Sequence, residues 1–156
     1  MRPVLSLNAA QKWVTPSSSG LVARFFAVFV IAMTMSSATA LGQDWAHTWG
    51  GASADSVSGI AVDPASGAIY ATGSTSSFGA GGVDVLLLKY DSSGSLVWSR
   101  TWGGPGNESG NSVAVDGLGN VYVVGSTDSF GAGWYDALIL KFDRSGNLLW
   151  SRTWGG

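Results

Sequence analysis

Short apolar runs separated by turn-forming residues make up most of the chain after its first forty residues. In the last third of the sequence these runs cover 112–116, 120–126, 135–142 and 148–154. They are rich in Val, Ile, Leu, Tyr and Trp, which favour strands, and short Gly- and Asp-containing turns join them, as in sequential antiparallel strands. A helical stripe of ten or more residues does not occur outside the N-terminal segment. The pattern therefore predicts an all-β region.

The sequence contains two copies of the same repeat unit. The phrase WAHTWGG begins at Trp45 and returns as WSRTWGG at Trp98 and at Trp150, with spacings of 53 and 52 residues. Between these anchors 27 of 52 aligned pairs are identical, and the one extra residue of the first copy falls in a surface turn. We therefore divide the chain into a segment resembling a fourth strand (41–51) and two repeats (52–103 and 104–156).

Four antiparallel strands that repeat about every 50 residues are typical of a β-propeller blade. The runs 85–88 and 137–140 are apolar without alternation, as expected for strands that are buried on both faces. The predicted fold is all-β, with two four-stranded antiparallel propeller blades that follow an N-terminal signal helix.

The two units resemble the bacterial seven-bladed β-propeller repeat family (SBBP-type repeats). The matching features are the W-x-x-T-W-G-G phrase, the V-D-x-x-G-N-V-Y turn from Val115 to Tyr122, the Gly-Ser-Thr after it, and the S-G-N-x-x-W approach to Trp150. The first copy departs mildly, with Asp63-Pro64 in the turn. The resemblance covers residues 45–156 and implies a propeller fold, but no particular activity.

Closed propellers hold about 4 to 8 blades, and repeat units need neighbours to bury their faces. The sequence contains two units and an additional fourth-strand phrase that lacks an obvious partner. We expect an incomplete propeller, and we favour a piece of a longer propeller. The alternatives are assembly with copies of itself into a ring, and a two-blade module docked on another protein.

The N-terminal segment has the features of a secretory signal. Arg2, Lys12 and Arg24 precede an apolar run at 25–35, and small residues lead to Ala38-Thr39-Ala40. This order predicts a signal peptide over 1–40 and an exported protein of the cell envelope or extracellular space. Contact with the membrane is expected only if this segment is not cleaved.

Composition excludes several classes of site. The chain has no cysteine, which excludes disulfides, thiolate-bound zinc and a thiol nucleophile, and its single histidine, His47, leaves no multi-histidine metal site. A net charge of −2 does not support nucleic-acid binding. We expect no metal, no cofactor and no catalytic residue. The glycine-rich segments 79–82 and 131–133 lack the G-K-[ST] of a phosphate loop.

Six aspartates recur at matching repeat positions: Asp63 and Asp116, Asp84 and Asp136, Asp91 and Asp143. A catalytic group normally breaks repeat symmetry, whereas these residues obey it. Aspartate at the end of a strand usually caps a turn by accepting backbone N–H bonds. Turn capping is therefore favoured over calcium binding, and calcium binding over acid–base catalysis.

The tryptophans recur in pairs four residues apart, such as Trp98 and Trp102, and so lie on one face of a strand. Packing between blades is favoured over stacking on sugar rings, because a large aromatic ring buries much area. Trp134 breaks the repeat, facing Gly82 of the first copy, and is the one candidate ligand-binding residue.

The sequence predicts a non-catalytic, exported repeat module with a structural or protein-interaction role. Its expected partners are further propeller blades, copies of itself, or a protein or glycan ligand. The alternative is a lectin-like carbohydrate-binding surface that uses Trp134. A propeller enzyme is disfavoured, because it needs convergent carboxylates that vary between blades.

Overall fold

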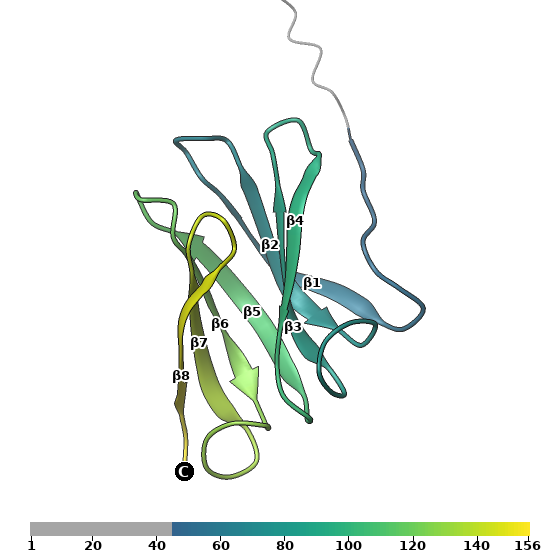
Figure 1. The fold of residues 1–156 in the computed structure, drawn as a ribbon, viewed down its shortest axis with the longest axis vertical. Coiled ribbons are helices and arrows are strands. Elements are labelled where there is room, and N and C mark those ends of the chain that lie inside the picture. The colour runs from purple at the N-terminus through teal and green to yellow at the C-terminus, as the bar shows by residue number, and fades with distance from the viewer. Residues whose placement is uncertain (1–44) are drawn as a thin grey trace, which may run out of the picture. The chain divides into compact units, whose positions relative to one another are not determined.

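The computed structural model describes residues 45–156, which form two four-stranded antiparallel sheets (Figure 1). The predicted signal segment lies outside the described residues. The first sheet contains β1 (Asp55–Val62), β2 (Ile69–Thr75), β3 (Asp84–Tyr90) and β4 (Leu96–Trp102), in that order. The second contains β5 (Glu108–Val115), β6 (Val121–Thr127), β7 (Asp136–Phe142) and β8 (Leu148–Trp154). The all-β prediction is confirmed for this region, and no helix in it could span a membrane.

The predicted apolar runs coincide with the strands of the second sheet, except that its first strand begins four residues earlier than expected. β5 starts at Glu108 rather than at position 112, because its first half (ESGN) carries no apolar pattern and is held by backbone pairing with β6. A bulge between Gly110 and Ser112 interrupts the register. Gly125 lies opposite, and a Cβ there would come within 1.7 Å of the Ser109 carbonyl oxygen. Glycine is therefore required at this close approach.

Residues 45–51, the described part of the fourth-strand-like segment, join neither sheet. They lie instead along one face of the first sheet, where Trp49 packs against the cluster formed by Ala71, Leu86, Leu88 and Tyr90. A strand needs a paired neighbour for its backbone groups, and β3 is already paired with β4 on its outer edge. The segment therefore keeps the tryptophan packing of a fourth strand without the backbone hydrogen bonds of strand pairing.

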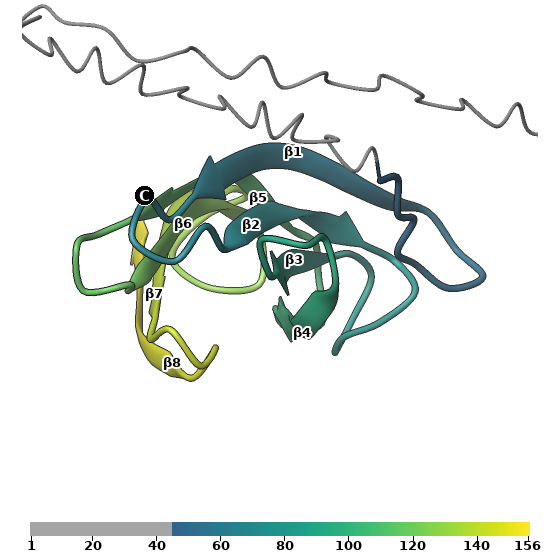
Figure 2. The same ribbon diagram turned by 90° about the horizontal axis from the view of Figure 1, so that it is seen from above.

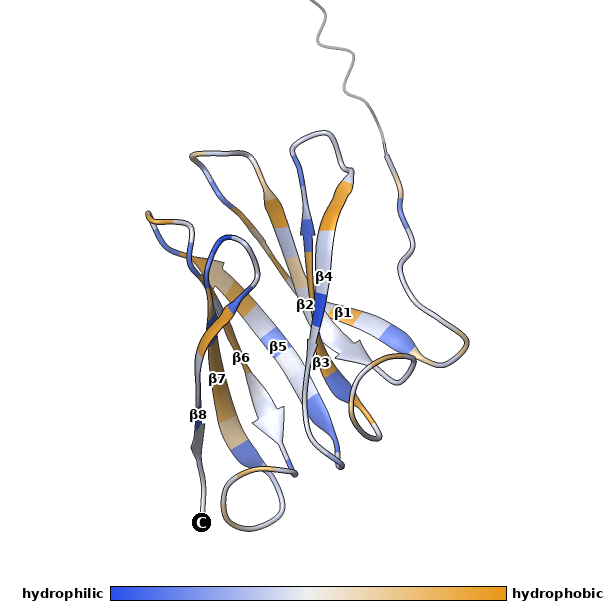
Figure 3. Ribbon diagram, in the orientation of Figure 1, coloured by the Kyte–Doolittle hydropathy of each residue, from blue (hydrophilic) through white to orange (hydrophobic). Residues whose placement is uncertain are grey.

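The core lies between the two sheets, which face each other (Figure 2). Hydrophobic residues gather on the central strands β2, β3, β6 and β7 (Figure 3). The buried cluster draws on both sheets: Ala68, Tyr70, Val85 and Leu87 from the first, and Val113, Val121, Val123, Leu138, Leu140 and Phe142 from the second. The face of the first sheet that carries Val85 and Leu87 is thus covered by the second sheet.

Candidate functional site

The face of the second sheet that points away from the first sheet is an apolar surface without a neighbour in the described chain. We call it the open face. Strand pairing places on it Tyr122, Val124, Ala137, Ile139, Lys141, Trp150, Arg152 and Trp154. Ala137, Ile139, Arg152, Thr153 and Trp154 line a shallow, mostly apolar depression there.

The open face repeats the covered face of the first sheet position by position. The covered face holds Tyr70, Thr72, Val85, Leu87, Lys89, Trp98, Arg100 and Trp102. Leu87 is 1% exposed, whereas its counterpart Ile139 is 42% exposed. Trp102 is half-buried against the core cluster, whereas Trp154 is 85% exposed. The same sequence pattern is therefore buried in one repeat and open in the next.

A stacked ladder of aromatic and cationic side chains crosses both faces. On the covered face the Lys89 ammonium lies 5.3 Å from the Tyr70 ring centre, and the Tyr70 and Trp98 rings are 6.0 Å apart. On the open face Lys141 lies 5.0 Å from the Tyr122 ring, and Arg152 lies 5.7 Å from the Trp150 ring. This stacking is therefore present even where no sheet covers it. The side chains of the open face already have the arrangement found on the covered face.

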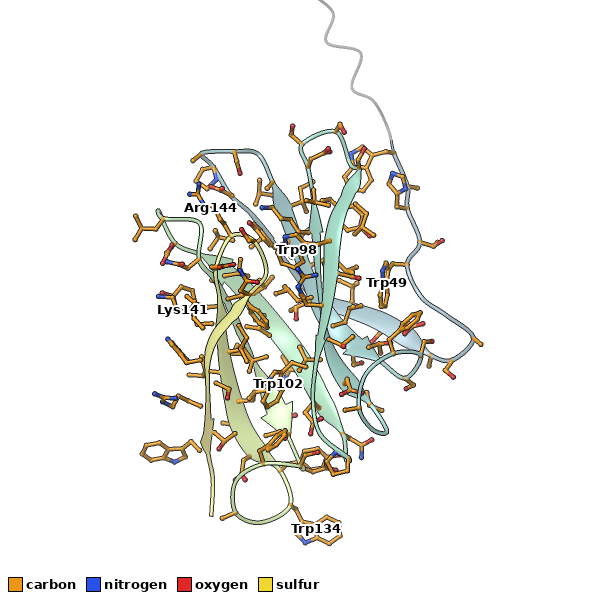
Figure 4. All side chains as sticks on the ribbon, in the orientation of Figure 1. Trp49, Trp98, Trp102, Trp134, Lys141 and Arg144 are labelled. Atoms are coloured by element: carbon orange, nitrogen blue, oxygen red, sulfur yellow. The ribbon has the colours of Figure 1, made fainter. Side chains whose placement is uncertain are left out.

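Polar contacts fix the register between the two sheets. Arg100 donates from Nε to the Gly146 carbonyl at 2.9 Å and from a terminal nitrogen to the Ser145 carbonyl at 3.2 Å. Lys89 Nζ donates to the Arg144 carbonyl at 2.9 Å. The β7–β8 turn of the second sheet is therefore clamped by two cations of the first. Trp98 lies between the sheets beside this clamp, and Trp102 lies between them farther along β4 (Figure 4).

The packing interpretation of the tryptophans is confirmed for Trp98 and Trp102, which contact the core cluster. Trp102 also lies 5.0 Å from the Phe130 ring. Trp134 stands apart from this arrangement, since it is 90% exposed and projects from the β6–β7 loop (Figure 4). No other predicted candidate residue accompanies it there.

The recurring aspartates of the short turns serve as turn caps, as predicted. Asp116 Oδ1 accepts bonds from the backbone N–H groups of Leu118 and Asn120, and its Oδ2 accepts from the Asn120 amide and the Tyr122 hydroxyl. Asp63, Asp91 and Asp143 likewise accept backbone N–H bonds within their turns. The Asn120 side chain, followed by the other donors, lowers the Asp116 pKa from 3.8 to about 2.

Of the third recurring pair, Asp84 also caps a loop, by accepting from the Ala80 N–H. Asp136 is buried, and its Oδ1 has no hydrogen-bond partner among the described residues. Across residues 45–156 there is no group of three or more His, Cys, Asp or Glu side chains that could hold a metal ion.

A buried carboxylate that sequence reasoning missed anchors the connection between the sheets. Glu108 is 1% exposed and accepts from the Gly104 N–H at 2.7 Å and from the Thr127 hydroxyl at 2.8 Å. Its counterpart in the first repeat, Asp55, accepts from the Gly51 N–H at 2.9 Å and from the Thr75 hydroxyl. The two acids are different residue types, Asp and Glu, so they do not show as an identical pair in the repeat. The threonines and glycines around them do recur.

Comparison with known proteins gives this arrangement a family. Residues 44–79 and 97–131 each match the family model described as a beta-propeller repeat (SBBP). Each match begins at the tryptophan phrase and ends in the loop after the second strand of the following sheet. These two segments therefore match the repeat family that the resemblance predicted.

One curated relative is the regulatory protein FlaEY of Caulobacter vibrioides, which is 35% identical over 86 residues. The aligned region covers 47% of this chain and 9% of that protein. The chain thus spans a small part of the relative's length.

The contrast between the two faces predicts different costs for the same substitution. Trp102→Ala should lower the free energy of unfolding by about 3 kcal/mol, because it opens a cavity beside the core cluster. Trp154→Ala, at the matching position, should change it by less than about 0.5 kcal/mol in dilute solution. Urea unfolding followed by circular dichroism measures both values, and equal losses would contradict the assignment of the open face.

The Asp116 cap predicts a pH dependence. Its pKa in the folded chain is depressed, so its contribution to stability is full above pH 3.8 and is lost as the pH falls through about 2. The difference in unfolding free energy between the natural chain and Asp116→Ser should therefore shrink from pH 5 to pH 2. A constant difference over this range, measured by urea titration, would show that the charge of Asp116 is not what stabilises the turn.

Proposed function

We propose that the two sheets are propeller blades of a non-catalytic module whose open face binds a further blade of the same kind. The carrying observation is the open face itself, which keeps the residues and the stacked ladder of a face that is buried one repeat earlier. Monomeric proteins rarely leave such a contiguous apolar surface uncovered unless it binds something. Closed propellers of about 4 to 8 blades provide such a neighbour on each side of a blade.

The chemistry of the carboxylates supports a structural role over an enzymatic one. The turn aspartates are engaged by backbone N–H groups, and Glu108 by a backbone N–H and a hydroxyl. An acid or base in catalysis needs a carboxylate that can reach a substrate proton. The relative FlaEY is named a regulatory protein, and such a role for that protein fits an interaction module.

Export is part of the same proposal. The cationic start, the apolar run at 25–35 and the Ala-Thr-Ala sequence before Leu41 favour a secreted or envelope protein. Without residues 1–40 the chain holds five basic residues against ten acidic ones, and it has no cysteine that would need oxidation. An interaction module outside the cell or in its envelope is consistent with this composition.

A third repeat supplied within one chain tests the proposal. A second copy of residues 105–156, fused after Gly156, continues the repeat, because Gly155-Gly156 then stands where Gly103-Gly104 stands in the natural chain. The urea midpoint should rise, because each added repeat contributes a new interface with its neighbour.

The matched control for this fusion carries Ile139→Asp on the face that becomes buried. This change should be tolerated in the natural chain, where Ile139 is exposed, and should abolish the gain in the fusion. An unchanged midpoint in the fusion without the substitution would refute the proposed function.

Trp134 supports a second candidate function, because an aromatic ring that is 90% exposed on a loop offers a stacking surface for a sugar. A glycan array probed with the full chain should then give signals that Trp134→Ala abolishes. Leu118→Ala, an equally loop-borne apolar residue that is 75% exposed, is the control and should leave those signals unchanged. Signals that survive Trp134→Ala would exclude this residue as the binding group.

A further inference from the structure

Residues 45–51, here called the leading segment, occupy on the first sheet the place that β4 occupies on the second. Trp49 lies 5.1 Å from the Phe78 ring, as Trp102 lies 5.0 Å from Phe130. The Gly51 N–H donates to Asp55, as that of Gly104 donates to Glu108.

The other end of the leading segment follows the same rule. The Trp45 ring crowds Gly94 of the β3–β4 turn, as Trp98 crowds Gly146 of the β7–β8 turn. The leading segment is therefore a stand-in for the fourth strand of a preceding blade.

This stand-in makes fewer contacts than a true fourth strand. It makes no strand pairing, and it has His47 at the repeat position that is Arg100 in β4 and Arg152 in β8. Arg100 donates two hydrogen bonds to the turn of the next sheet, at Gly146 and Ser145. Among the hydrogen bonds of residues 45–156, none involves His47, and none reaches the corresponding carbonyls of Ser93 and Gly94.

Beside the leading segment the first sheet keeps an open apolar groove. The groove is lined by Trp45, His47, Val57, Ile60, Ile69, Ala71, Leu88 and Tyr90. Ile60 is 69% exposed, whereas its counterpart Val113 is 7% exposed because the first sheet covers it. The groove is the place where the central strands of a preceding blade would pack.

The open face carries the groups that this groove and turn lack. Arg152 is stacked on Trp150 and donates one bond to the Ser151 carbonyl, as Arg100 does to that of Ser99. Its remaining N–H groups make no other hydrogen bond among the described residues, so they correspond to the donors that Arg100 uses between the sheets. β8 is also held in register by β7, which the leading segment is not.

We propose that the open face docks on the groove of a second copy of this chain, and that residues 150–155 of the first copy displace the leading segment of the second. The inference rests on the proposed function and names the partner of the same face. The contact joins two different surfaces, so it propagates head to tail into a ring or a chain of copies. The leading segment is the intramolecular competitor that limits this assembly.

Cysteine pairs test the docking directly, because the natural chain has no cysteine. Within the chain, a Cβ on Gly110 would lie 2.2 Å from the Thr72 hydroxyl, so these positions meet across the sheets. Their counterparts at the proposed contact are Val57 in the groove and Val124 on the open face. These two valines lie on opposite outward faces of the two-sheet unit, so they cannot bridge within one molecule.

The full chain with Val57→Cys and Val124→Cys should give a ladder of disulfide-linked dimers and larger species on a non-reducing gel after mild oxidation. The control pair, Leu118→Cys with Val124→Cys, keeps an exposed thiol in place of Val57 but should give no ladder above that of the single variants. A Val57–Val124 yield no higher than the control, together with a stabilised three-repeat fusion, would overturn the second copy as partner and leave the proposed function standing.

The competition is tested by substitutions added to the Val57–Val124 pair. His47→Arg should reduce the ladder several-fold, because an arginine there supplies the missing donors to Ser93 and Gly94 and strengthens the leading segment. His47→Gln is the control and should leave the ladder unchanged. A ladder that His47→Arg leaves unchanged would overturn the displacement of the leading segment.

Trp49 and Trp154 should respond in opposite directions although they hold the same repeat position. Trp49→Ala should increase the ladder by weakening the leading segment, and Trp154→Ala should decrease it by weakening the open face. The thermal unfolding of each variant shows whether the first sheet is intact. A decrease with both variants, with folding preserved, would contradict the proposed competition.

Discussion

Burial of both faces of each sheet is the constraint on which this structure depends. The strands β3 and β7 are apolar on both sides, so a sheet built from them cannot leave either face in water without a cost of about 25 cal/mol per Å² of apolar surface. The first sheet meets this demand with the second sheet on one side and, in part, with the leading segment on the other. The second sheet meets it on one side only, and this imbalance gives the molecule its candidate binding surface.

Besides nonpolar burial, hydrogen bonds between the sheets fix their register. The hydrophobic cluster alone would tolerate sliding, because Val, Leu and Ile make contacts that have little direction. Arg100 and Lys89 remove that freedom by binding the carbonyls of one particular turn. The turn can present those carbonyls because Asp143 holds it closed, so the repeated aspartate supports the interface indirectly.

The fold could be predicted from the sequence because each structural pattern occurs in both copies of the repeat. Tyr70 and Tyr122, or Trp98 and Trp150, report the same structural position, and periodicity then assigns strands and faces. The start of β5 could not be read, since Ser109, Gly110 and Asn111 are placed by pairing with β6 rather than by hydrophobic pattern. Glu108 was missed for a similar reason, because its role depends on donors that are distant in sequence, such as Thr127.

The site was less accessible to sequence reasoning than the fold. Trp134 stands out in the sequence because it breaks the repeat, whereas the open face consists of residues that obey it. Residues such as Ile139 and Trp154 differ from Leu87 and Trp102 mainly in what lies next to them, and a linear sequence does not contain that information. The turn aspartates were read correctly because an Asx turn is a local structure.

The strands β4 and β8 end in the same pentapeptide, WSRTW, and two glycines follow each copy. The shared sequence alone therefore does not determine which sheet each copy completes. The short turns 91–95 and 143–147 do so, because each keeps one copy next to its own third strand. Exchange of the two copies between the sheets would require the closure of a much longer loop, which costs more conformational entropy.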